Sequence, residues 1–209
     1  SNGSWDCLSD PEALLAAARA KGIDRLGITD HNRLGVALDM FAKYPDAVIP
    51  GEEVKTREGI DLIGLYIENE IPKGTPAHEV CERIREEGGV VYLPHPYAPG
   101  KGGGGRFAES LAPSVDIIEV FNARLHPARW NKPAEDLALS HGKARGAGSD
   151  AHTLMEVGGA WVEVPRHPNN PKGLLEALAH GRVDGVTAPT WIHLASTWAK
   201  IRKKLPGYR

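Results

Sequence analysis

The sequence has little of what marks several large classes of protein. Its two cysteines, Cys7 and Cys81, are too few for a disulfide framework. No apolar run approaches the roughly 20 residues that a membrane-spanning helix needs. The formal net charge of −2 gives no overall attraction for nucleic acid or for an anionic membrane. Any anion must therefore be bound by a local site.

The N-terminal residues and the cysteines bear on the cellular compartment, and the chain length bears on the number of domains. The first residues, SNGSWD, lack the charged start and the apolar core of a signal peptide. Because both cysteines are interpreted as reduced thiols, we expect a cytoplasmic protein. A length of 209 residues suits one domain with a substantial core.

Helical and strand-like segments alternate along most of the chain, which predicts an α/β fold with a mostly parallel sheet. Helices are expected at 11–21, 34–43, 75–87, 131–141 and 171–180, and short apolar strands at 23–29, 47–50, 61–67, 90–93, 116–121, 144–148 and 161–164. This pattern occupies a domain at 1–188. Residues 189–209 form a basic tail, which we expect to be a helix that packs on the domain through Trp191 and Trp198.

Nine histidines are the unusual component, and several of them lie in polar clusters that follow a predicted strand. These clusters are TDHN at 29–32, GEE at 51–53, PHP at 94–96, Glu119 with Asn122, and GSDAH at 148–152. In a β/α barrel the ends of the strands meet at one rim. Histidine nitrogen combined with carboxylate oxygen suits Mn, Fe or Zn. Singly, each residue has an ordinary interpretation as a loop residue or helix cap, so it is their conjunction that predicts a metal site.

The order of these motifs resembles the PHP (polymerase and histidinol phosphatase) family over roughly residues 1–159. The resemblance implies a distorted seven-stranded β/α (TIM-like) barrel that holds two or three divalent metal ions (Mn, Fe or Zn). By motif position it implies five ligands, His31, Glu53, His95, Asp150 and His152. In the family the first strand is followed by a serine, a second serine and an acidic residue. Ser1, Ser4 and Asp6 fall in that spacing, so the resemblance also implies Asp6 as a ligand; the alternative is that Asp6 caps the helix at Pro11.

One family feature is missing from the sequence. An H-x-H pair ends the first strand in the family, and Ser1 corresponds to the residue directly after it. We therefore expect that the first barrel strand is truncated from this sequence. On that expectation the metal site is incomplete here, holds one or two ions, and is impaired. The alternative is a protein that has lost these ligands.

The implied activity is hydrolysis of a phosphate monoester or diester by metal-activated hydroxide, with Asp150 and His152 in the catalytic set. The expected partner is a small phosphorylated substrate or a nucleotide. Substrate contacts are predicted at Arg124, Asn122 and Arg106; the last follows a glycine-rich stretch that is either a lid or a surface loop. The alternatives are a non-catalytic module that binds metal or nucleotide, and a nuclease acting on nucleic-acid ends, for which the basic tail would matter.

Overall fold

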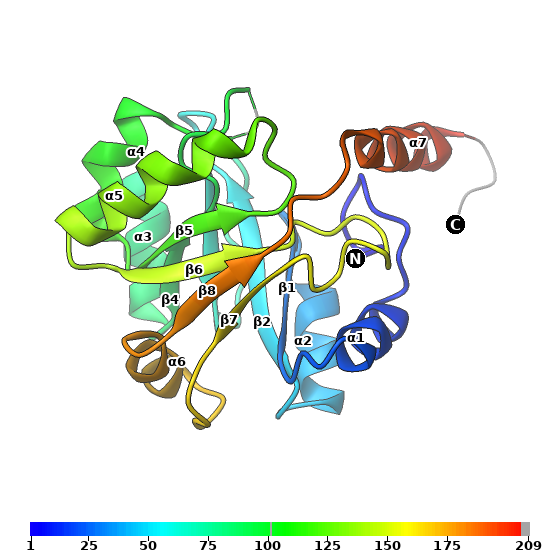
Figure 1. Ribbon diagram of the computed structural model, residues 1–209, viewed down its shortest axis with the longest axis horizontal. Helices are drawn as coiled ribbons and strands as arrows, with labels where there is room; N and C mark the ends of the chain where they lie inside the picture. The colour runs from blue at the N-terminus through cyan, green and yellow to red at the C-terminus, as the bar shows by residue number, and fades with distance from the viewer. Residues whose placement is uncertain (101, 206–209) are drawn as a thin grey trace.

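A curled sheet of six strands forms the centre of the computed structural model, which describes residues 1–100 and 102–205 (Figure 1). The strands lie in the order β1-β2-β3-β4-β5-β6 across the sheet. Their bounds are β1 Leu26–His31, β2 Val48–Lys55, β3 Asp61–Leu65, β4 Val90–Leu93, β5 Ile117–Asn122 and β6 Ala144–Gly148. The predicted mixed α/β class is confirmed, with six strands in this sheet over the described ranges.

One strand runs against the others. β1 and β2 are parallel, as are β4, β5 and β6, but β3 is antiparallel to both β2 and β4. A short turn reverses the chain after β2, with Gly59 at φ 82°, a conformation that glycine adopts without steric cost. The reversal places Asp61, the first residue of β3, opposite Lys55, the last residue of β2. Most pairings in the sheet are parallel, as expected, and β3 is the exception.

The helices cover the sheet, and those with predicted ranges begin close to the predicted positions; the short helix at Arg106–Leu111 was not predicted. They are α1 Pro11–Ala20, α2 Gly35–Lys43, α3 Ala77–Glu86, α4 Arg106–Leu111, α5 Lys132–Ser140, α6 Pro171–Leu178 and α7 His193–Lys204, with 3-10 turns at Ala112–Ser114, Ala128–Asn131 and Thr190–Ile192. Asp10 caps α1, since its side chain accepts a hydrogen bond from the Ala13 amide. Helix α3 is capped by a residue distant in sequence: the Glu58 carboxylate accepts a hydrogen bond from the Ala77 amide at 2.9 Å.

The hydrophobic core lies between the sheet and these helices. Helix α3 contributes the buried side chains of Val80, Cys81 and Ile84 to this core. The fit is close at Gly64 of β3, where an added Cβ would come 2.9 Å from Ile84 Cγ1. Each fully buried side chain of this size contributes roughly 1.5–3 kcal/mol. The packed helices thereby fix the sheet whose strand ends carry the site.

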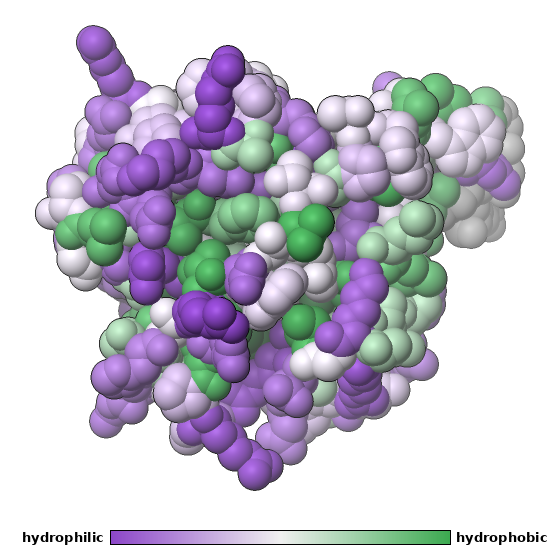
Figure 2. All heavy atoms as spheres, in the orientation of Figure 1, coloured by the Kyte–Doolittle hydropathy of each residue, from purple (hydrophilic) through white to green (hydrophobic). Residues whose placement is uncertain are grey.

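A second sheet and the C-terminal helix complete the fold. Strand β7 (Ala160–Glu163) pairs antiparallel with β8 (Arg182–Gly185). In the tail, Ile192 and Ala199 are buried, whereas Trp191 and Trp198 are 54% and 58% exposed. The tryptophans therefore lie on the outer face of the tail, and the expectation that they pack on the domain is wrong. Figure 2 shows apolar side chains on the outer surface over α7.

Among the described residues, none of the helices combines the length and apolar character needed to cross a bilayer.

Candidate metal centre

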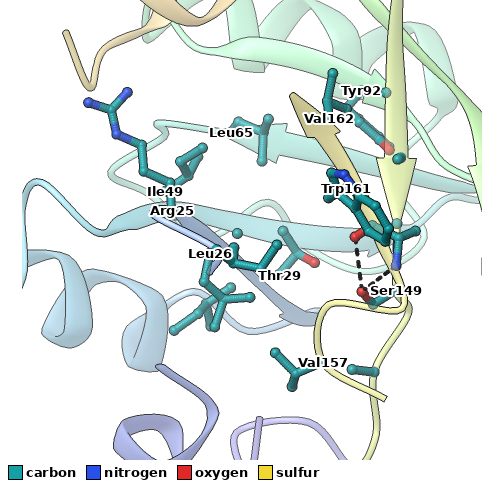
Figure 3. A pocket seen from close by; sticks show the side chains of 18 of the residues that line it. Arg25, Leu26, Thr29, Ile49, Leu65, Tyr92, Ser149, Val157, Trp161 and Val162 are labelled. Atoms are coloured by element: carbon teal, nitrogen blue, oxygen red, sulfur yellow. Dashed lines mark hydrogen bonds between the residues drawn. The ribbon is translucent and has the colours of Figure 1, made fainter. Parts of the chain in front are cut away.

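A cavity of about 1380 Å³ opens where strands of the large sheet end, and all six predicted ligands line it. These residues are Asp6, His31, Glu53, His95, Asp150 and His152. Figure 3 shows apolar side chains further along the same cavity, with Leu26, Ile49 and Leu65 facing Trp161. The polar clusters predicted to meet at one rim therefore do lie around one space, with an apolar wall behind them.

Asp6, His31 and His152 form the first group of ligand-type side chains. Asp6 Oδ2 lies 3.2 Å from His152 Nε2 and 3.7 Å from His31 Nε2. The other oxygen of Asp6 accepts a hydrogen bond from the Ser4 hydroxyl at 2.6 Å. Asp6 is 4% exposed and does not cap α1, where Asp10 acts instead. Two distant histidines thus converge on one buried carboxylate.

Glu53, Asp61 and His95 form the second group. Glu53 Oε1 lies 3.4 Å from His95 Nε2, and Glu53 Oε2 lies 3.5 Å from His31 Nδ1. Glu53 therefore stands between the two groups. Asp61 was not among the sequence candidates. The turn at 56–60, which brings Asp61 to this edge, lacks a strong two-residue hairpin signature, so little in the local sequence indicated this placement.

The separations within the groups suit ligands of a common ion. Zinc and similar ions take nitrogen and oxygen ligands at about 2.0–2.2 Å, so tetrahedral ligand atoms lie roughly 3.4 Å apart. Within the second group, the 3.4 Å between Glu53 and His95 matches this spacing and exceeds the usual hydrogen-bond length. The 3.5 Å between Glu53 and His31, which joins the two groups, does so as well. Among the described residues, Glu53 Oε1 and His95 Nδ1 are buried without a hydrogen-bond partner. The donor set therefore fits divalent metal ions.

Proximity to one another shifts the pKa values of these groups. Burial alone would raise the pKa of Asp6 and of Glu53. Neighbouring histidines outweigh burial, so the pKa of each carboxyl lies below its ordinary value. Burial would lower the pKa of His95 and of His152, but their carboxylate partners raise both to about 9. In the metal-free protein these histidines are cations at neutral pH.

Buried carboxylates outside the two groups hold the site in place. Glu119 accepts hydrogen bonds from the His95 amide at 2.7 Å and from Asn122 Nδ2 at 2.9 Å. Asp30 accepts from the Ser4 amide at 3.1 Å, which fixes the segment that carries Asp6. Glu119 lies so close to β6 that a Cβ at Gly148 would come within 1.9 Å of its Oε1.

The backbone at the strand ends is strained. Asn32, His95 and Asp150 have φ values of 53°, 28° and 49°, a left-handed region that side-chain-bearing residues seldom adopt. Each follows a strand that leads into the cavity. Such strain is retained where a functional site requires it.

The structure separates Asp150 from the ligand groups. Its carboxylate Oδ1 is 3.6 Å from His152 Nδ1, and it belongs to neither group. The Asp150 carbonyl lies 2.8 Å from the same ring nitrogen, which orients the imidazole and leaves Nε2 facing Asp6. Its role as a ligand stays a prediction.

Of the three predicted substrate contacts, Asn122 lines the cavity, and Arg124 and Arg106 do not. Arg124 is 4% exposed; its Nε lies 2.9 Å from Glu156 Oε1, and its guanidinium also contacts His152. Asn122 lines the cavity but is occupied by Glu119 and by the Arg124 amide. Arg106 is exposed at the start of α4 and is not part of the cavity lining.

The glycine-rich stretch before Arg106 packs against the second ligand group. The Asp61 amide donates to the Gly102 carbonyl at 2.9 Å. A Cβ at Gly102 would come within 1.6 Å of the Asp61 carboxylate. Glycine is therefore required there for close approach to the site.

Comparison with known proteins identifies the family. The PHP-associated family model PHP_C matches residues 128–183. The uncharacterized protein MJ1587 of Methanocaldococcus jannaschii is 39% identical over 122 residues, which cover 56% of this chain and 69% of that protein. The uncharacterized protein MJ0417 of the same organism is 33% identical over 168 residues, covering 75% of this chain and 65% of the relative. The chain thus spans about two thirds of the length of these relatives.

A solved structure shares the fold. The crystal structure of a two-domain protein from Bacteroides vulgatus, containing a predicted PHP-like metal-dependent phosphoesterase, matches with a TM-score of 0.67. The match covers 95% of this chain and 67% of that one at 15% identity, a level that shows the fold alone. The family model and the sequence relatives confirm the resemblance noted from the motifs, and the solved structure agrees with it in fold: this chain belongs to the PHP family.

Proposed function

We propose that the protein is a metal-dependent phosphoesterase, which hydrolyses a phosphate monoester or diester at the cavity mouth. The observation that carries this proposal is the pair of ligand groups joined through Glu53. Divalent ions held there would lower the pKa of a water molecule and neutralise charge on the phosphate. The proposed ions are Mn, Fe or Zn, two or three in number, because these accept mixed histidine and carboxylate sets.

The side chains have separate proposed roles. Asp6, His31 and His152 hold one ion, and Glu53, Asp61 and His95 hold another. Asp150 stands beside His152 with its side chain 29% exposed, so it is placed to complete a metal shell or to take a proton. Arg124 acts through His152, which it contacts from the buried side; this revises its expected role as a phosphate contact.

We also propose that the sheet belongs to a seven-stranded barrel. Strands β1 and β6 are the two edges of the six-stranded sheet, and both line the cavity. A further strand between β1 and β6 would pair with both and present its side chains to the same ligand groups. The H-x-H pair that the family resemblance implies would then lie next to His31.

The proposal is tested with a panel of phosphate esters. A form of the protein that includes the proposed seventh strand is assayed with Mn²⁺ and with a chelator. The substrates are p-nitrophenyl phosphate, bis-p-nitrophenyl phosphate, nucleoside monophosphates and phosphorylated oligonucleotides. Asp150→Ala removes a site carboxylate, and Asp39→Ala, at an exposed position on α2, is the matched control. We expect hydrolysis that the chelator abolishes, that Asp150→Ala lowers by about a hundredfold or more, and that Asp39→Ala leaves unchanged.

Activity that is indifferent to both the chelator and Asp150→Ala would contradict the mechanism. Metal binding with no hydrolysis of any ester would favour the non-catalytic module instead. A preference for oligonucleotides whose rate falls steeply with added salt would point to a nuclease.

A further inference from the structure

Helix α7 is fastened to the segment that carries Asp6. Lys203 Nζ donates to the carbonyl oxygen of Asn2 at 2.6 Å and also to that of Ser4. The hydroxyl of Ser4 in turn donates to Asp6. Figure 1 shows the helix lying beside this N-terminal segment. The C-terminal helix is therefore a neighbour of the metal centre rather than a remote tail.

This attachment brings a second lysine over the first ligand group. Lys200 Nζ lies 3.9 Å from Asp6 Oδ2 and 4.3 Å from the centroid of the Trp5 ring. The Trp5 ring in turn lies 6.4 Å from the His31 ring, between centroids. A cation over a tryptophan face is attracted by the ring electrons. Trp5 thereby holds the ammonium group at the edge of the group formed by Asp6, His31 and His152.

The ammonium group of Lys200 lies near Asp6 but makes no hydrogen bond to its carboxylate. Both Asp6 oxygens have closer partners, in Ser4 at 2.6 Å and His152 at 3.2 Å. A separation of 3.9 Å is too long for a hydrogen bond, and the Lys200 side chain is 39% exposed. An ammonium group carries three donors, so this one can meet an incoming anion.

Three other cationic side chains near the centre have close partners within the protein. Arg124 is buried against Glu156 at 2.9 Å, and Lys55 lies 2.6 Å from Asp61. Lys203 donates to backbone carbonyls. Within the part of the chain that the structure describes, Lys200 is thus the cation best placed to meet a ligand beside the first group.

We propose that Lys200 is a phosphate-binding residue, which holds phosphoryl oxygens of the substrate beside Asp6, His31 and His152. A dianionic phosphate needs positive charge in addition to that of the ions, and lysine supplies it as a compact point charge. The assignment rests on the proposed phosphoesterase function. It also gives the basic tail a role at the site itself.

Binding of methylphosphonate, a phosphate ester analogue that cannot be hydrolysed, tests the proposal without turnover. Isothermal titration is carried out on the whole chain, with and without Mn²⁺. Lys200→Met removes the charge and keeps the apolar stem over Trp5; Lys200→Arg restores charge. Lys204→Met is the matched control, because Lys204 is exposed on the same helix. Thermal melts verify that each variant is folded.

We expect Lys200→Met to weaken methylphosphonate binding by about ten- to a hundredfold, as for loss of a charged hydrogen bond. Lys200→Arg should recover most of the affinity, and Lys204→Met should match the wild type. Mn²⁺ affinity should not fall in Lys200→Met. Equal methylphosphonate binding by wild type and Lys200→Met, or an equal loss in Lys204→Met, would overturn the proposal. Methylphosphonate binding that depends on Lys200, together with no ester hydrolysis by a form that includes the proposed seventh strand, would support the Lys200 assignment and refute the phosphoesterase function.

Discussion

Metal binding should release protons, because the two ligand groups each contain a histidine that is charged in the metal-free protein. The pKa of His95 and the pKa of His152 are both raised to about 9 by neighbouring carboxylates. Histidine ligates metal only in its neutral form. Each ion that binds below this pKa must therefore displace a proton.

The magnitude follows from the distance between the working pH and the pKa. At about pH 7 each histidine lies roughly two units below its pKa, which weakens each binding step about a hundredfold, or by about 3 kcal/mol. The sign is fixed: apparent affinity rises with pH, about tenfold per unit for each ion, and levels off above about pH 9.

Titration calorimetry in buffers of different ionisation enthalpy measures this release directly. The slope of observed heat against buffer enthalpy is expected to show close to one proton released per ion at about pH 7. His152→Gln should remove the release that belongs to the first group. His180→Gln, at an exposed position after α6, is the matched control and should match the wild type. A wild-type slope near zero would refute the reasoning, since it would mean that the histidines are already neutral or are not ligands.

Three further predictions concern single side chains. Burial raises the pKa of Glu52 from 4.5 to about 7, so wild-type stability should fall by about 3 kcal/mol as pH rises through this window. Glu52→Gln should flatten that slope in denaturant titrations; an unchanged slope would contradict the assignment. Gly148→Ala should displace Glu119, lower the free energy of unfolding by about 1–3 kcal/mol and weaken metal binding. An unchanged melting temperature and metal affinity would show that β6 moves to make room for the added methyl group. Asp61→Asn should weaken metal binding by about tenfold or more, with exposed Asp184→Asn as the control; equal affinities would remove Asp61 from the ligand set.

Much of the fold could be predicted because its signals are local. Helix caps, glycine stops and short apolar runs placed most helices and strands within a few residues of their observed bounds. The reversal at β3 was missed because alternating helices and strands favour a parallel sheet, while the hairpin turn at 56–60 has no strong two-residue signature. Strand alternation also separates neighbours: Glu53 faces the cavity, while Glu52 accepts from the Ile71 amide in the core.

Five of the six predicted ligand residues, all except Asp6, lie at or within a few residues of a strand end, and strand ends converge whatever the details of packing, so the sequence could predict that they line one cavity. Asp6 lies in the segment before α1, where the family resemblance predicted it. The role of these residues as ligands stays a prediction. The substrate contacts could not be found in the same way. Arg124 has the sequence context of a loop cation, yet its guanidinium is buried against Glu156. Whether a charge meets solvent or a buried partner depends on contacts that no local pattern contains.

The sequence by itself therefore determined the family, the α/β class and the residues that surround one cavity, because these follow from motif order and local periodicity. Only the tertiary structure decided that Asp61 joins Glu53 and His95. It also decided that α7 turns Lys200 toward Asp6, while Trp198 of the same helix and Trp191 of the preceding turn are exposed. The physical reason is separation along the chain. Lys203 and Asn2 are 201 residues apart, and such contacts arise from packing of the whole fold.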